Sequence, residues 1–408
     1  MRQIESVPDA QPLTSTELPL APAGALDGLL VADFSRVLAG PLAGMTLGDL
    51  GATVIKVESS SGDDTRRWQP PTSADGESTY FLAANRNKRS IVLDLKNPKD
   101  QDLAVRLSER ADILIENFAP GTAERFGIGY DQVAARNPGV VYASVTGFGR
   151  DAGAGLPGYD FLIQAVGGLM SMTGPPDGEP TKTGVALVDV LAGQNLVSGV
   201  LAALLARQRT GRGQRVDVSL LGTLLAALAN QASAHLNAGV TPHRMGNRHP
   251  SITPYETLRT ADRPIAVAVG NDAQFHRFAA AIGLPVDPAI ETNAARVQHR
   301  DRLVTAIEAV LVTRPAADWL AELTRAGIAC GPVNTVGEGF QLAADLGLDP
   351  VVRQDRDGTP VRTPASPIRL SAAPASYRHP PPRLGAHTAE ITSWLLDDPG
   401  ARPPGASE

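Results

Sequence analysis

The feature that most constrains the fold is a strand–helix–strand unit near the start of the chain. Residues 29–33 form an apolar run typical of a buried strand, and residues 42–50 have helical spacing that ends at Gly51. Residues 53–58 form a second apolar strand, and residues 34–40 are expected to be the loop that leaves the first strand. A βαβ unit of this kind predicts a parallel sheet.

The same alternation continues along the first half of the chain. Further strands are predicted at residues 91–95, 112–116, 140–145 and 214–220, with helices at 98–110, 130–136, 159–170 and after Asp189. Strands that alternate with helices predict a doubly wound α/β domain.

The pattern changes after about residue 225, where one short strand is followed mainly by helices. A strand is expected at residues 264–269, and helices at 273–282, 295–312, 316–326 and 388–396. We therefore predict a flexible N-terminal arm (1–25), a large Rossmann-like domain (26–225), a small α+β domain with linkers (226–340) and a C-terminal segment that returns to the large domain (341–408).

Composition argues against several classes of protein. A net charge of −6 without a long basic run disfavours nucleic-acid binding, and the single cysteine, Cys330, cannot form an internal disulfide or a cysteine-based zinc site. The longest apolar stretch, residues 191–206, is interrupted by glycine, glutamine and asparagine, and the N-terminus lacks the pattern of a signal peptide. These features predict a soluble cytoplasmic protein that binds neither membranes nor nucleic acid.

The first βαβ unit lacks the fingerprint of a dinucleotide site. Residues 34–41 contain one glycine, Gly40, followed by Pro41, instead of the G-x-G-x-x-G that lets a pyrophosphate approach the backbone. An enzyme that uses NAD or FAD is therefore not expected.

Asp189 is the strongest candidate for chemistry, because it follows an apolar run and opens a long helix. The simplest interpretation is an N-cap carboxylate that accepts backbone N–H bonds. The same placement also suits a nucleophile, because helix-end amides keep a carboxylate ionised and an ionised aspartate can attack a thioester.

Several segments, taken together and in order, resemble one family. They are residues 34–41, 50–58, 87–90, 116–118, 210–219 and 384–388. On these motifs the chain, over about residues 27 to 395, is similar to the class III coenzyme A-transferases, of the formyl-CoA transferase and α-methylacyl-CoA racemase superfamily.

The resemblance implies a Rossmann-like large domain with a small domain, an interlocked homodimer, and a site between domains with Asp189 as the catalytic residue. It implies coenzyme A or acyl-CoA as a substrate, with no tightly bound cofactor and no metal. Ser59 and Pro157 stand where some members have arginine and lysine, so phosphate contacts are expected to pass to Arg66, Arg67, Lys88 or Arg89. The CoA-binding positions that it implies are Val37, Leu38, Ala39, Leu93, Lys96, Asn117, Phe118, Arg125 and Tyr159.

The function expected from the resemblance is transfer of CoA from an acyl-CoA, with succinyl-CoA as a candidate donor, to a carboxylic acid through aspartyl anhydride and aspartyl-CoA thioester intermediates. One alternative is a 2-methylacyl-CoA racemase or epimerase, although the racemase histidine is replaced by Tyr159, and tyrosine, with an ordinary pKa of about 10, shuttles protons poorly near neutrality. A second alternative is a non-catalytic protein that binds CoA thioesters.

The loop that contains Gly246, Asn247, Arg248 and His249 resembles members that use dicarboxylic acids. Arg248 or His249 could hold a second carboxylate through charge-assisted hydrogen bonds. The same residues could equally form a hinge or a lid, and both interpretations stay open at this point.

Overall fold

The computed structural model describes residues 24–397 and 403–404. The predicted N-terminal arm therefore lies, except for residues 24 and 25, outside the described residues. The chain divides into two compact units, the first formed by residues 1–144, 196–216 and 353–408 and the second by residues 145–195 and 217–352. These ranges differ from those of the predicted domains, and the domain boundaries stay a prediction because contacts within one folded chain do not test independent folding.

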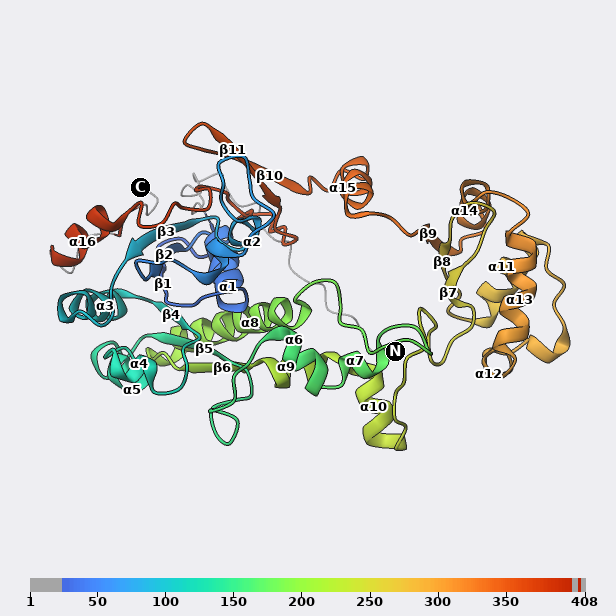
Figure 1. Ribbon diagram of the computed structural model, residues 1–408, viewed down its shortest axis with the longest axis horizontal. Coiled ribbons are helices and arrows are strands. Elements are labelled where there is room, and N and C mark those ends of the chain that lie inside the picture. Colours follow the sequence, from blue (N-terminus) through green and yellow to red (C-terminus); the bar gives the residue numbers. More distant parts are fainter. Residues whose placement is uncertain (1–23, 398–402, 405–408) are drawn as a thin grey trace, which may run out of the picture. The chain divides into compact units, whose positions relative to one another are not determined.

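A six-stranded sheet with the order β3-β2-β1-β4-β5-β6 is built around the first unit (Figure 1). Its first strands, β1 (Leu30–Asp33) and β2 (Thr53–Glu58), are parallel, as are the pairs β2–β3, β1–β4 and β4–β5. The predicted Rossmann-like α/β sheet is thus confirmed. The other strands are β3 (Lys88–Val92), β4 (Ile113–Glu116), β5 (Val141–Thr146) and β6 (Arg215–Ser219).

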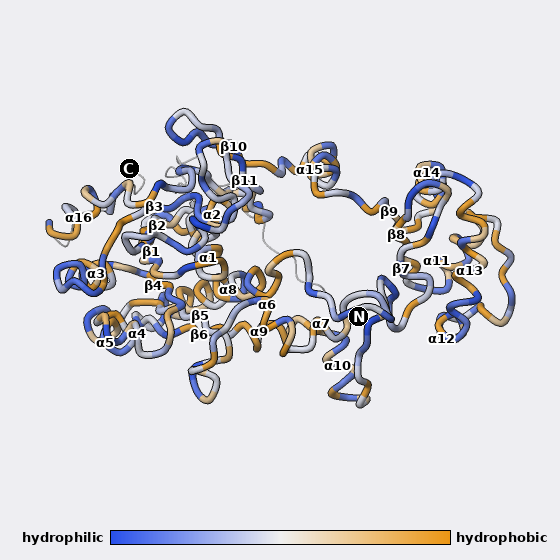
Figure 2. The backbone as a smooth tube through the Cα atoms, in the orientation of Figure 1, coloured by the Kyte–Doolittle hydropathy of each residue, from blue (hydrophilic) through white to orange (hydrophobic). Residues whose placement is uncertain are grey.

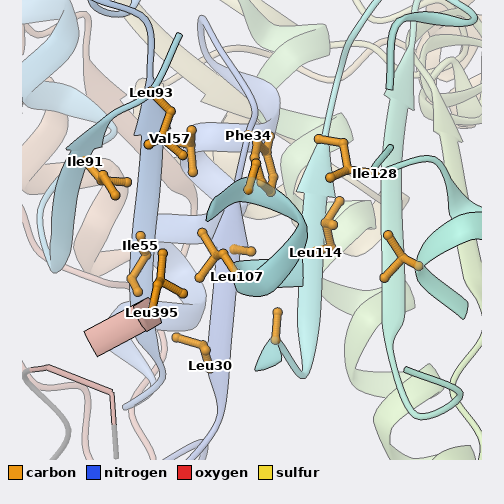
Figure 3. Close-up of a cluster of buried hydrophobic side chains, with 14 of the residues drawn as sticks. Leu30, Phe34, Ile55, Val57, Ile91, Leu93, Leu107, Leu114, Ile128 and Leu395 are labelled. Atoms are coloured by element: carbon orange, nitrogen blue, oxygen red, sulfur yellow. The ribbon is translucent and has the colours of Figure 1, made fainter. Parts of the chain in front are cut away.

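Alternate side chains of the strands build the core on one face of this sheet. Leu30, Ile55 and Leu114 lie in a cluster with Leu107 of α3 (Pro98–Arg110) and Leu395 of α16 (Thr388–Leu396) (Figure 3). The helix α3 is mostly hydrophilic (Figure 2), and its buried Ala104 and Leu107, three positions apart, belong to this cluster, as expected of a helix with one covered face. The C-terminal helix therefore completes the core of the first unit.

The helix α1 (Ala39–Asp49) contacts β1 to β4, and Gly51 after it adopts a positive φ of 114°. The prediction that this helix ends before Gly51 is confirmed, with Leu50 as its C-cap, but the helix starts three residues before the predicted residue 42. The remaining elements of the first unit are η1 (Asp64–Arg67), α2 (Thr79–Ala83), α4 (Thr122–Arg125), α5 (Tyr130–Arg136), β10 (Val351–Arg356) and β11 (Thr359–Pro364). Strands β10 and β11 form a separate two-stranded sheet, and the first two residues of β10 belong to the second unit.

The long helix α8 (Leu187–Thr210) carries the chain from the second unit into the first. Gly199 packs so closely on β6 that a Cβ there would lie 2.6 Å from a methyl group of Val216. This helix is also long and apolar enough to meet a length-and-composition test for a membrane span. A buried core helix meets the same test, and Leu196 and Val200 are fully buried.

A three-stranded antiparallel sheet and a layer of helices form the core of the second unit. Strands β7 (Tyr255–Leu258), β8 (Ile265–Ala268) and β9 (Ala329–Pro332) pair in that order and pack with α11, α13 and α14. The helices of this unit, besides the start of α8, are α6 (Asp160–Val166), α7 (Leu169–Met172), α9 (Leu220–Ala227), α10 (Ala229–Ala238), α11 (Asp272–Ile282), η2 (Pro288–Ile290), α12 (Asn293–Gln298), α13 (Arg300–Leu311), α14 (Ala316–Arg325) and α15 (Val336–Asp345).

Candidate active site

The loops after β1 and β4 meet where the strand order reverses, which is the position at which open α/β sheets bind ligands. Asn117, just after β4, joins them: its Oδ1 accepts from the N–H of Arg36 at 2.9 Å and its Nδ2 donates to the Arg36 carbonyl at 2.8 Å. The Asn117 side chain thus fixes this loop, which lies where a dinucleotide-binding protein has a glycine-rich turn.

A cavity of about 320 Å³ lies beside these loops. Three of the predicted CoA-binding residues line it, namely Leu93, Lys96 and Phe118. Arg125 reaches its edge by donating to the hydroxyl of Thr122, a lining residue, at 2.9 Å. The aromatic rings of Phe118 and Phe126 together with exposed Lys96 give the cavity an apolar wall and a cation, a combination suited to a base and a phosphate.

Val37 and Leu38 lie in the turn between β1 and α1, next to the lining residue Arg36, and Ala39 is the first residue of α1. Val37 has a φ of 73°, which is unusual for a β-branched residue. Leu38 is the N-cap of α1, and its apolar side chain makes no capping hydrogen bond to the first amides of this helix.

Three of the basic residues predicted to replace the missing phosphate contacts are already engaged. Arg66 is buried between Glu58 and Glu77, and the Lys88 Nζ is fully buried at 2.8 Å from Asp33. Arg89 pairs with Glu390. Pairing of these charges within the protein disfavours the expectation that the three side chains bind phosphate. Arg67 also forms an ion pair, with Asp64 at 2.9 Å, but its side chain is largely exposed.

The second unit holds Asp189 in the first turn of α8, which begins at Leu187. The N-cap interpretation of Asp189 is wrong, because the carboxylate that caps this helix belongs to Asp160 of α6. The Asp160 Oδ1 accepts from the backbone N–H groups of Val188 at 2.7 Å and of Asp189 at 3.2 Å. Asp160 therefore fixes the backbone of the candidate nucleophile.

Gln164, which is fully buried, extends this support. Its Nε2 donates to the Asp160 Oδ2 at 2.6 Å, and its Oε1 accepts from the backbone N–H of Thr183 at 2.9 Å. The segment that leads into α8 is thus tied through Gln164 and Asp160 to α6, and the Asp189 side chain is held half-buried at the helix start.

Burial, and then the charge of Asp160, raise the pKa of Asp189 from 3.8 to about 7. Burial therefore works against the ionised form that the helix end was expected to favour, and a carboxyl with a pKa near 7 is only partly ionised at neutral pH. A carboxylate with little hydration is a stronger nucleophile once it is ionised.

The raised pKa predicts that Asp189→Asn stabilises the protein, and more at pH 8 than at pH 5.5. The folded state binds the Asp189 proton more tightly than the unfolded state, so the wild type loses stability as the pH rises from 3.8 to about 7, and the penalty is complete above that. With screening of a half-buried carboxyl, a gain of ~1 kcal/mol and a Tm a few degrees higher at pH 8 are expected. Equal Tm values for the two proteins at pH 8, measured by calorimetry, would contradict the raised pKa.

Tyr159, predicted to contact CoA, is the N-cap of α6 and is 62% exposed. Gly246 lies in the predicted loop with a φ of 63°, and the Asn247 Nδ2 donates to the Thr257 hydroxyl at 3.0 Å. Arg248 pairs with Asp301 at 3.0 Å and Glu256 at 3.5 Å, while the Nδ1 of His249 accepts from the backbone N–H of Ser251. These contacts favour a structural role for the loop as it stands, although an acid that displaces exposed Asp301 would meet the Arg248 guanidinium.

Two features of these sites were not predicted from the sequence pattern. Lys56 and Asp63 form a fully buried ion pair at 2.9 Å that borders the cavity. The second feature is Gln164, for which the sequence predicted only a position in the helix at residues 159–170. In the part of the chain that the structure describes, no group of three or more metal-ligating side chains occurs.

Comparisons with known proteins identify the family of this chain. A family model described as CoA-transferase family III matches residues 26–388. The chain is 41% identical over 384 residues to a succinate–glutarate CoA-transferase of Agrobacterium fabrum (91% of this chain, 95% of the relative), and 38% identical over 374 residues to an acetyl-CoA:oxalate CoA-transferase of Acetobacter aceti (90% and 94%). The crystal structure of a CAIB/BAIF family protein from Brucella suis superposes with a TM-score of 0.81 at 42% identity, covering 91% of this chain and 99% of that one. The chain therefore belongs to CoA-transferase family III.

Proposed function

We propose that this enzyme transfers CoA from an acyl-CoA, with succinyl-CoA as a candidate donor, to a dicarboxylic acid, and that Asp189 is its nucleophile. The observation that carries the proposal is the Asp189 carboxylate, half-buried in the first turn of α8 on a backbone that Asp160 fixes. A nucleophile held in one place and shielded from water suits formation of an anhydride, which water would otherwise hydrolyse.

The proposed cycle begins when an Asp189 carboxylate oxygen attacks the thioester carbonyl carbon of the donor. The C–S bond breaks, CoA leaves as its thiolate, and an aspartyl–acyl anhydride remains. The thiolate then attacks the Asp189 carbonyl carbon, which releases the donor acid and leaves an aspartyl-CoA thioester. The acceptor carboxylate enters by the reverse of these two steps and departs as the new acyl-CoA.

The proposed CoA site is the cavity of the first unit together with the turn at Val37, Leu38 and Ala39. Phe118 and Leu93 would pack on the adenine, and Lys96, with Arg125 and Arg67 at its edge, would face phosphate oxygens. Asn117 would act by fixing the turn, and Tyr159 would contact the thioester arm. No resident cofactor enters this chemistry, because the CoA thioester itself supplies the activated group.

The acceptor is proposed to be a dicarboxylic acid because the two relatives are named for glutarate and oxalate. The second carboxylate would pair with Arg248 of the 246–249 loop in place of Asp301. The test is an acceptor panel with succinyl-CoA as donor, in which dicarboxylates of two to six carbons are compared with monocarboxylates of equal length. Equal kcat/KM for both classes would overturn this choice.

Racemisation of 2-methylacyl-CoA is the nearest rival activity. It needs an acid–base pair at the α-carbon, and Tyr159 stands where the racemases have histidine. Incorporation of deuterium at the α-carbon of a 2-methylacyl-CoA, with no transfer to any acid, would favour the racemase, whereas transfer without deuterium incorporation would support the transferase. Binding of CoA with neither reaction would favour the non-catalytic alternative.

The pKa of Asp189 near 7 predicts a steep pH dependence. Only the ionised carboxyl attacks, so kcat/KM should fall about tenfold for each pH unit below 7 and level off above about pH 8. The measurement is a pH profile of kcat/KM for the acyl-CoA, between pH 5.5 and 9. A flat profile across pH 6 to 7 would show that the nucleophile is already ionised at pH 6.

A homodimer in the cytoplasm is also proposed. All residues of α15 are at least partly exposed, and its apolar Val336 is 79% exposed. Apolar side chains of this kind are commonly covered by a second copy. Light scattering after size-exclusion chromatography distinguishes a dimer from a monomer of 42.6 kDa.

A further inference from the structure

Side chains hold five backbone polar groups of the turn after β1, those of Ser35 and Arg36 and the N–H of Val37. Asp33 accepts from the backbone N–H of Ser35 at 3.0 Å, and the Lys56 Nζ donates to the Ser35 carbonyl at 3.0 Å. Asn117 takes both the N–H and the carbonyl of Arg36, as described above. The N–H of Val37 donates to both oxygens of Asp63, each at 3.3 Å.

This turn is held in a conformation that its sequence disfavours. Val37 at a φ of 73° places a β-branched side chain in the left-handed region, where steric clashes make the conformation costly. Such a residue persists only where its surroundings over-determine it, and strained residues of this kind gather at functional sites. Here the surroundings include the buried ion pair of Lys56 and Asp63.

Asp63 is the member of this set that acts on Val37. Its side chain is fully buried, and although burial alone raises the pKa of an aspartate, Lys56 and the hydrogen bonds from Thr65 lower the pKa of Asp63 to about 2. The carboxylate is thus permanently charged at physiological pH. It borders the cavity together with Arg36 and Lys56.

We propose that Asp63, paired with Lys56 at 2.9 Å, is a positioning residue for CoA: its hydrogen bonds to the N–H of Val37 stabilise the left-handed turn in the form that receives the ligand. This inference rests on the proposed CoA site. It predicts that loss of the Asp63 carboxylate weakens CoA binding because the turn relaxes, and that glycine at position 37, which adopts a positive φ without strain, makes the turn less dependent on Asp63.

The test is a double-mutant cycle of Asp63→Ala and Val37→Gly, with the dissociation constant for CoA measured by titration calorimetry. Asp63→Ala is expected to raise the Kd about tenfold in the wild-type background and less than threefold in the Val37→Gly background. A loss of equal size in both backgrounds would show that Asp63 does not act through the turn. An unchanged Kd in folded Asp63→Ala would overturn the proposal outright.

Asp49→Ala is the matched control, because it breaks another buried ion pair of the same unit, with Arg86 at 2.5 Å, at the opposite end of α1. It should lower the Tm by a similar amount and leave the Kd within about twofold. A tenfold loss of CoA affinity in this control as well would show that Asp63→Ala weakens binding only through general destabilisation. Where Asp63→Ala does not fold, the milder Asp63→Asn takes its place in the same cycle. A wild-type protein that binds no CoA would overturn the proposed function instead.

Discussion

Asp189→Ala is expected to lower CoA transfer by about 10⁴-fold or more, because both covalent intermediates of the proposed cycle, the anhydride and the CoA thioester, form on this one carboxyl group. The neighbouring carboxylate cannot replace it. Asp160 is buried, and its oxygens accept from Val188, Asp189 and Gln164, so it would have to break the support of the helix start to reach a thioester.

The measurement combines steady-state rates with mass spectrometry of the intact protein after brief incubation with succinyl-CoA. Wild-type protein should carry a CoA-sized adduct that hydroxylamine converts to a hydroxamate at Asp189, and the alanine variant should carry neither. Asp318→Ala on α14 is the control, since it removes a carboxylate of the same unit that is largely exposed. An adduct that survives in Asp189→Ala, or that maps to another residue, would rule out Asp189 as the nucleophile.

Several strands and helices of the first unit could be predicted from the sequence because the signals that mark them are local. The strand at residues 53–58 and the helices at 98–110, 130–136 and 388–396 have the predicted bounds, since apolar periodicity and flanking breakers mark them clearly. The start of α1 was placed too late. Its N-cap is Leu38, which makes no side-chain cap, and Pro41 inside the first turn resembles a stop signal.

The candidate site could be predicted less well, because the contacts that shape it join residues that are distant in the sequence. Asp189 could be singled out from its position at a helix start, but the carboxylate that caps the helix, Asp160, lies 29 residues earlier. Lys88 resembled a free cation at a strand end, yet it binds Asp33, 55 residues away. A local pattern assigns charges to residues but does not show which charges meet in the fold.

This also explains why the resemblance to the family was more informative than any single motif. Six loose motifs in order fix the topology, and the topology brings Asn117 to Arg36 across 81 residues. Spacing alone does not predict that contact. The dinucleotide fingerprint is absent because a network of side chains, rather than glycines, shapes the turn at the switch point.

Lys56→Met is expected to cost about 3–5 kcal/mol of unfolding free energy, because it breaks a buried ion pair by removing one partner. The Lys56 Nζ donates to Asp63 at 2.9 Å and to the Ser35 carbonyl at 3.0 Å, and both charged side chains are fully buried. Methionine fills much of the volume but leaves Asp63 as an uncompensated buried charge. The folded-state pKa of Asp63 is about 2, below the ordinary 3.8, so the ion pair stabilises the fold above pH 3.8 and its contribution is lost as the pH falls toward 2.

Urea unfolding at pH 7, where the pair is fully charged, measures this cost. Lys96→Met, at an exposed position of the same unit, should change stability by less than about 0.5 kcal/mol. Adding Asp63→Asn to Lys56→Met should recover part of the loss, because the orphaned charge is then removed, whereas the two effects would add if the residues did not interact. If this double variant recovers stability but not CoA affinity, the ion pair has two separate roles, one in stabilising the fold and one in holding the turn at Val37. The neutral pair can pack in the core without holding that turn.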